Sequence, residues 1–174
     1  MADCLAGEAA RSGAWAETHL PYSDLYNIFK HNANDSFTDY LRVSSTSKGG
    51  QYFERIFRPS AKPWFVRASF KGLVNKELLT TCLRLRSNHY NLNDSLFRCK
   101  IVESPACNCG NASEDANHLF FSCARHESAR RKLLRAFRRK RMFPPYDIVA
   151  IVANPSLSVL KIIGEFLKEC KIQI

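Results

Sequence analysis

The sequence predicts a mainly α fold, in which a small helical domain is organised around one structural zinc knuckle. Apolar residues recur every three or four positions along much of the chain, which is typical of helices that bury one face. Three cysteines and one histidine lie within 17 residues at a spacing suited to metal ligands. With 174 residues and 45% hydrophobic content, the chain can bury one core and a small satellite.

The cysteine and histidine cluster is the clearest candidate site. Cys107, Cys109, His118 and Cys123 follow the pattern C-x-C-x8-H-x4-C. Thiolates and imidazole are the ligands of structural zinc sites, and four of them can surround one tetrahedral ion. Gly110, directly after the second thiolate, supplies the backbone freedom that a tight metal turn needs. The spacing therefore predicts one zinc ion held by these four side chains.

Other cysteines and histidines are weaker candidates for metal binding. Cys99 and His89 lie well before the first ligand, and His126 follows a complete set, so these three are reserve ligands. Seven cysteines, an odd number with three of them in one cluster, fit a reducing compartment better than a disulfide framework. The cysteines outside the cluster are interpreted as ordinary small hydrophobic residues: Cys4, Cys82, Cys99 and Cys170.

Composition bears on the compartment and on the partners. The longest apolar runs are far shorter than the roughly 20 residues of a membrane span. The start, MADCLAGEAARSGAWAE, lacks the basic and apolar regions of a secretory signal. We therefore expect an intracellular protein of the nucleus or cytoplasm, without a membrane partner. The net charge of +10 points to an anionic partner.

The first 50 residues are expected to be helical. Residues 2–17 have the composition of a short helix that ends near Gly13 or before Pro21. Residues 18–50 form a helical linker region that starts at PYSD and ends in the polar loop SSTSKGG, residues 44–50. One or two helices in this linker carry a broken apolar stripe: Leu25, Ile28, Phe29, Phe37, Tyr40 and Leu41.

Residues 51–174 are predicted to form the zinc-knuckle domain. Its first part, residues 51–71, interleaves six aromatic rings with cations and is kept partly extended by Pro59 and Pro63. The rings could stack on bases, but burial in the core is the stronger interpretation. Residues 73–86 have helical periodicity, and a second helix near Asn93 is expected to bury four apolar side chains: Leu92, Leu96, Phe97 and Ile101.

Residues 125–141 predict a basic amphipathic helix. They hold nine Lys or Arg against one Glu, so they carry +8 of the net charge. Leu133, Leu134 and Phe137 form its narrow apolar stripe. A charge of this density repels itself without an anionic partner, which favours nucleic acid over a merely solvated face. The candidate phosphate contacts are Arg130, Arg131, Lys132, Arg135, Arg138, Arg139, Lys140 and Arg141.

A last amphipathic helix is predicted over residues 155–172, capped around Asn154, Pro155 and Ser156. Its core-facing stripe repeats at helical period. The stripe comprises Leu157, Leu160, Ile163, Phe166, Leu167 and Cys170.

The order of these features resembles a known protein region. The run LRLRSNHYNLNDSLFR, the ESPACNCG turn, EDANHLFFSC and the basic helix follow one another. This order resembles the extreme C-terminal region of the polyprotein of non-LTR retrotransposons, particularly arthropod elements of the Jockey, I and R1 type. In those polyproteins a reverse transcriptase and an RNase H domain precede such a tail. The start MADCLAGEAARSG looks like the last RNase H helix, so the resemblance covers essentially the whole chain.

The resemblance implies a remnant rather than an enzyme. Residues 1–17 would be the remnant of the C-terminal RNase H helix, and Asp3 would match the final catalytic carboxylate. RNase H chemistry needs several carboxylates that hold two metal ions about 4 Å apart, and the strands that bear the others are absent from this sequence. We expect a truncated copy, a cleaved piece or a host gene derived from the tail of such an element, with other parts of the polyprotein as possible partners.

Two functions are left open by the residues. The first is a non-enzymatic, zinc-dependent module that binds RNA or single-stranded DNA without sequence preference. The second is a structural or protein-interaction module without direct nucleic-acid contact. Nuclease activity is disfavoured because four protein ligands leave no coordination position for an activated water. Salt dependence separates the two functions, since phosphate binding weakens log-linearly with ionic strength.

Overall fold

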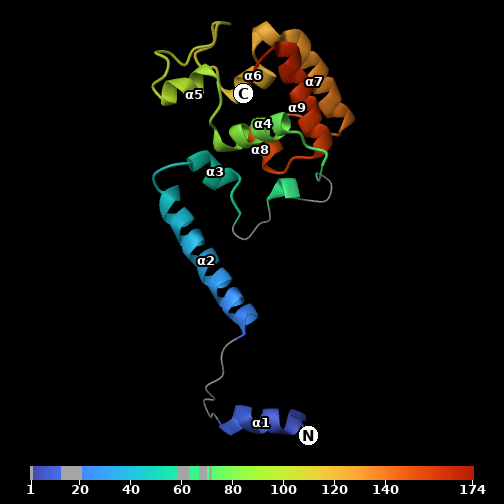
Figure 1. Ribbon diagram of the computed structural model, residues 1–174. Helices are drawn as coiled ribbons and strands as arrows, with labels where there is room; N and C mark the ends of the chain where they lie inside the picture. Colours follow the sequence, from blue (N-terminus) through green and yellow to red (C-terminus); the bar gives the residue numbers. More distant parts are fainter. Residues whose placement is uncertain (1, 13–20, 59–62, 67–69, 71) are drawn as a thin grey trace. The chain divides into compact units, whose positions relative to one another are not determined.

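The computed structural model describes residues 2–12, 21–58, 63–66, 70 and 72–174, and within these ranges it contains helices and no strand (Figure 1). The prediction of a helical fold is therefore confirmed for the described residues. Two short 3-10 turns, Trp64–Val66 and Ala124–His126, accompany the α-helices. The α-helices are α1 (Ala2–Ser12), α2 (Tyr22–Ser45), α3 (Gly50–Arg55), α4 (Lys76–Ser87), α5 (Asn93–Arg98), α6 (Ala116–Phe121), α7 (Glu127–Arg139), α8 (Ile148–Ala153) and α9 (Leu157–Cys170).

The chain divides into two compact units, Met1–Val43 and Ser44–Ile174. The first unit contains α1 and nearly all of α2. In the second unit, α7 packs against α9, and α4 packs against both α8 and α9. This second unit holds the metal-ligand candidates and the basic helix, so it carries the candidate functional site.

Polar side chains fix the starts of four helices in the second unit. In each, an oxygen accepts a hydrogen bond from a backbone N–H in the first turn, which satisfies a donor that has no partner inside the helix. Ser156 caps α9 by accepting from Val159, as the sequence around Asn154 predicted. The other three caps are Asn75 for α4, Asp115 for α6 and Asp147 for α8.

One hydrophobic core lies beneath these helices. Phe120 of α6 and Phe137 of α7 are completely buried, and the Phe120 ring lies 5.0 Å from that of Phe166 on α9. Leu133 of α7 and Ile163 of α9 belong to the same core. The apolar stripes predicted on the basic helix and on the last helix therefore do face the core, although Leu134, Leu157 and Cys170 are only partly buried.

Three expectations about local structure need correction. Phe97 and Ile101 were expected on the buried side of the second helix, but they are 45% and 67% exposed. Helix α5 ends at Arg98 after six residues, so Ile101 lies beyond it, and within the helix the buried residue is Ser95, with Leu92 buried just before it. The helix predicted from residue 73 begins only at Lys76, with Asn75 as its cap, so Leu73 lies before α4 and is exposed.

The structure describes only part of the N-terminal segment for which helices were predicted. The helix predicted over 2–17 is described as α1, Ala2–Ser12, while the Asp3 side chain and Trp15 lie outside what the structure describes. The predicted linker helix is one continuous helix, α2. Among the described residues, no helix combines the length and the apolar character needed to cross a membrane.

Candidate metal centre and its basic helix

The four predicted ligands meet at one place. One candidate ligand atom from each of Cys107, Cys109, His118 and Cys123 lies within 4.8 Å of the others. We call these residues the Cys3His cluster. The Sγ atoms of Cys107 and Cys123 are 3.8 Å apart, and the Sγ of Cys109 is 3.2 Å from Nε2 of His118. Among the described residues this is the one group of this kind.

The spacing of the sulfur atoms fits a tetrahedral ion. Two thiolates that each lie about 2.3 Å from a zinc ion at tetrahedral angles are about 3.8 Å apart. Cys107 and Cys123 have this separation. Three sulfurs and one imidazole nitrogen are also the donor set that zinc prefers in structural sites. The Cys3His cluster could therefore hold a metal ion such as zinc.

A tight turn and a short helix position the ligands. Gly110 adopts φ +93°, a conformation that favours glycine, and its N–H donates to the Cys107 carbonyl at 2.9 Å. His118 lies in α6, where the Asp115 carboxylate accepts a hydrogen bond from the His118 N–H at 2.8 Å. Because the next residue, Leu119, is buried in the core, the helix that carries the imidazole is fixed in place.

Residues around the cluster support the ligands, and sequence reasoning missed them. Ser122 Oγ lies 3.2 Å from Nδ1 of His118, so it can fix the ring with Nε2 directed at Cys109. Glu114 Oε1 lies 3.5 Å from Cys107 Sγ. The position of Ser122, four residues after a histidine in a helix, is the signal that could have found it.

The thiols differ in acidity. Burial, together with hydrogen bonds to Cys109 and Cys123, raises the pKa of the Cys107 thiol to about 12. The pKa of Cys109 is lowered, mainly by the backbone N–H of Asn111. Metal ligands must be deprotonated, so binding at this cluster would release protons and become weaker as the pH falls.

The reserve ligands do not join the cluster. Cys99 Sγ and His89 Nδ1 lie 3.9 Å apart at an exposed position of their own. His126 is half-buried, and its pKa is lowered by burial and by the neighbouring Arg125. None of these three residues extends the ligand set of the described structure.

The predicted phosphate contacts fall into two groups. Arg130 is half-buried and donates a hydrogen bond to the Cys123 carbonyl. Lys132 contacts Glu169 of α9 at 2.8 Å, and Arg131 contacts Glu127 one turn back at 3.5 Å. The second group is exposed and has no acidic partner within 4.0 Å among the described residues. These residues, which we call the terminal cations, are Arg135, Arg138, Arg139, Lys140 and Arg141.

Two of the six aromatic rings in residues 51–71 are buried in the core. Trp64 and Phe70 are about 5% exposed, and their rings meet edge to face at 5.1 Å. Phe65 is 38% exposed. The interpretation that these rings fill the core is therefore confirmed for Trp64 and Phe70, while Pro59 lies outside the described residues.

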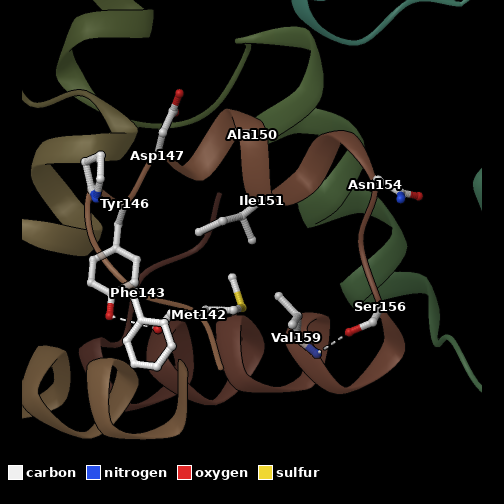
Figure 2. A pocket seen from close by; sticks show the side chains of 10 residues that line it. Met142, Phe143, Tyr146, Asp147, Ala150, Ile151, Asn154, Ser156 and Val159 are labelled. Carbon is white, nitrogen blue, oxygen red and sulfur yellow. Dashed lines mark hydrogen bonds between the residues drawn. The ribbon is translucent and has the colours of Figure 1, made fainter. Parts of the chain in front are cut away.

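A pocket of about 380 Å³ lies between α8 and the start of α9, beside the loop that follows α7 (Figure 2). Tyr146 donates from its hydroxyl to the Met142 carbonyl, and its ring stacks on Phe121. The carboxylate of Asp147 on the pocket wall already accepts hydrogen bonds from Asn117 and from the Val149 N–H. The pocket therefore offers mainly apolar surface, and sequence reasoning did not anticipate it.

Comparisons with protein-family models, with curated proteins and with solved structures found no match to this chain.

Proposed function

We propose that this chain is a non-enzymatic, zinc-dependent module that binds RNA or single-stranded DNA, and that it derives from the tail of a non-LTR retrotransposon reverse transcriptase. The observation that carries the proposal is the pairing of a Cys3His cluster with the terminal cations, which lie at the other end of α7 without acidic partners in the described structure. In this proposal the terminal cations bind the nucleic acid, and the Cys3His cluster orients the helix that carries them.

The electrostatic argument rests on which charges are already used. Lys132 and Arg131 form ion pairs inside the chain, and Arg130 bonds to backbone. These contacts reduce their availability to a ligand. The terminal cations place five positive charges within seven residues, 135–141. Charges of one sign at this density attract a polyanion and repel each other when it is absent. Phosphate contacts of this kind position a nucleic acid without reading its sequence.

The cluster gives the basic helix a fixed starting point. Zinc bound there would close the loop between residues 107 and 123 and leave no open coordination position. Arg130 joins α7 to the last ligand residue through the Cys123 carbonyl, and Leu133 and Phe137 hold the helix on the core. The terminal cations therefore extend from a helix that is anchored at its start and along one side.

The test is a salt titration of binding to a single-stranded RNA and to a single-stranded DNA of equal length. We expect log K to fall linearly with log salt, with a slope of roughly −0.7 for each phosphate neutralised on a single strand. Replacing Arg135, Arg138 and Arg139 together by Gln should reduce that slope by about two units. Gln keeps helix propensity, so the fold should survive.

A charge-matched control separates the basic helix from net charge. Lys48, Lys76 and Lys161 are exposed and lie outside the basic segment. Their joint replacement by Gln lowers the net charge equally but should leave most of the affinity and the slope. If the two triple variants bound alike, or if the parent bound neither nucleic acid, the alternative of a structural or protein-interaction module would replace this proposal.

A further inference from the structure

The pocket shown in Figure 2 begins where the basic segment ends. Helix α7 ends at Arg139, and Arg141 adopts φ +58°, the left-handed conformation in which many helices end. The Met142 N–H then donates to the Phe137 carbonyl at 3.0 Å, which closes this turn. Met142 and Phe143, the next two residues of the chain, both line the pocket. The last of the terminal cations is therefore a direct neighbour of the pocket wall.

Phe143 presents an aromatic ring to solvent at this place. It is 67% exposed, whereas Met142 packs against the core. Tyr146, which also lines the pocket, is held by the hydrogen bond from its hydroxyl to the Met142 carbonyl. Figure 2 shows the two rings at one side of the pocket and Asn154 and Ser156 at the other. A large exposed ring at the edge of a pocket is a candidate contact for a ligand.

The lining of the pocket suits a flat, uncharged ring better than a phosphate. Its volume of about 380 Å³ lies in the range of roughly 300–1,000 Å³ that is usual for ligand pockets. Ile151 and Val159 contribute apolar surface to its wall. The described residues that line it include no Lys or Arg, and they include the Asp147 carboxylate. A phosphate would therefore stay outside at the terminal cations, while a ring could enter.

We infer that Phe143 and this pocket form a base-binding site, which takes an unpaired nucleobase of the strand whose phosphates contact the terminal cations. The inference rests on the proposed function, since the terminal cations bring the strand to the pocket. Arg141 and Phe143 are two residues apart, so their Cα atoms lie at most about 7 Å from each other. One nucleotide can therefore place its phosphate at the cation and its base at the ring. Every base can stack in this way, because each has a π-face.

A site of this kind favours single strands over duplexes. In a duplex each base is paired and stacked inside the helix, and it must leave the stack before it can reach Phe143. In a single strand the bases are open to stacking on aromatic side chains. The terminal cations alone would not give this preference, because a duplex carries the higher density of phosphate charge. The base-binding site therefore selects RNA and single-stranded DNA without a preference for sequence.

The test compares two single strands that carry the same phosphates. One is a short oligothymidylate, and the other is an oligomer of equal length in which every sugar lacks its base. The full chain should bind the oligothymidylate at least about five-fold more tightly, because stacking of one base on an aromatic side chain contributes at least about that factor. Phe143→Ala should remove most of this difference and leave the salt slope unchanged, since no cation is lost. Phe143→Trp should keep the difference.

A second variant fills the pocket without changing Phe143. Ala150 is exposed on α8 and lines the pocket, and Leu is a strong helix former, so Ala150→Leu should keep the fold. This variant should also reduce the preference for oligothymidylate. The matched control is Phe97→Ala, which removes an exposed ring of α5 outside the pocket. It should leave both affinities unchanged.

Failure of this inference can be told apart from failure of the proposed function. A parent chain that bound both oligomers equally, with the expected dependence on salt, would overturn the base-binding site alone. A parent chain that bound neither oligomer at low salt would overturn both proposals. A preference for oligothymidylate that survived both Phe143→Ala and Ala150→Leu would mean that the bases contact another surface, and it would also overturn this site.

Discussion

Arg130 donates a hydrogen bond from its guanidinium to the backbone carbonyl of Cys123, so the first turn of the basic helix is tied directly to the last residue of the Cys3His cluster. Arg130 is half-buried, unlike the terminal cations. A side chain that sequence reasoning assigned to phosphate binding therefore has a contact inside the protein. This difference separates two roles within one run of basic residues.

We predict that Arg130→Gln and Arg138→Gln have opposite effects in two assays. Arg130→Gln removes a charge-assisted hydrogen bond, so it should lower the free energy of unfolding by about 1–2 kcal/mol. Its effect on the salt slope of RNA binding should be small. Arg138→Gln should leave stability within about 0.5 kcal/mol of the parent and lower the slope by roughly 0.7. Urea unfolding and salt titration of both variants make the comparison, which fails if the two variants behave alike.

The second prediction concerns metal content. The purified chain should contain one zinc ion, and Cys109→Ser together with His118→Ala should abolish its retention and lower the melting temperature, because metal binding at such sites is folding free energy. Metal analysis by mass spectrometry and thermal unfolding with and without chelator measure both effects. Cys99→Ser, at an exposed cysteine outside the cluster, is the control and should retain the metal. Full zinc retention in the double variant would exclude this ligand set.

The features that could be predicted from the sequence are those whose residues lie close together in the chain. The ligand set was predictable because its four residues lie within 17 positions and their spacing is typical of metal sites. The N-cap at Ser156 and the core-facing stripes of α7 and α9 were also local patterns. For Phe97 and Ile101 the same reasoning failed. Periodicity indicates one face of a helix, but it does not say whether another element covers that face.

Contacts between segments that lie far apart in the chain could not be predicted from the sequence. Lys132 contacts Glu169, which lies 37 residues later, and no local pattern relates them. Arg55 likewise pairs with Asp147 across 92 residues. Ion pairs of this kind depend on how α7 packs on α9 and α3 near α8, and packing is decided by the whole core. The division of the basic residues into paired and unpaired groups therefore required the structure.

A third prediction compares two phenylalanines. Phe137 is completely buried and Phe97 is 45% exposed. Phe137→Ala should lower the free energy of unfolding by about 3–5 kcal/mol, because it removes buried apolar surface and leaves a cavity. Phe97→Ala should cost less than about 1 kcal/mol. Chemical unfolding of both variants tests the corrected position of Phe97, and equal losses would show that Phe97 is buried as the sequence predicted.

The last prediction is a dependence on pH that arises at Asp147, the residue that caps the start of α8. Burial alone would raise the pKa of this carboxyl, but hydrogen bonds from Arg55, the Val149 N–H and Asn117 outweigh it and lower the pKa. A lowered pKa in the folded state means that the carboxylate stabilises the fold above the ordinary aspartate value of about 4, and that this contribution is lost as the pH falls further. Asp147→Asn should therefore lower the free energy of unfolding by about 1 kcal/mol at pH 7, and its difference from the parent should shrink as the pH falls below about 4.

Because any loss of metal in acid affects both proteins, the measured quantity is the difference between their free energies of unfolding at each pH. Glu127→Gln, which removes a carboxylate from an exposed pair with Arg131, serves as the control and should change stability little at any pH. A difference between Asp147→Asn and the parent that stayed constant from pH 7 to pH 3 would mean that the charge of Asp147 does not contribute to stability.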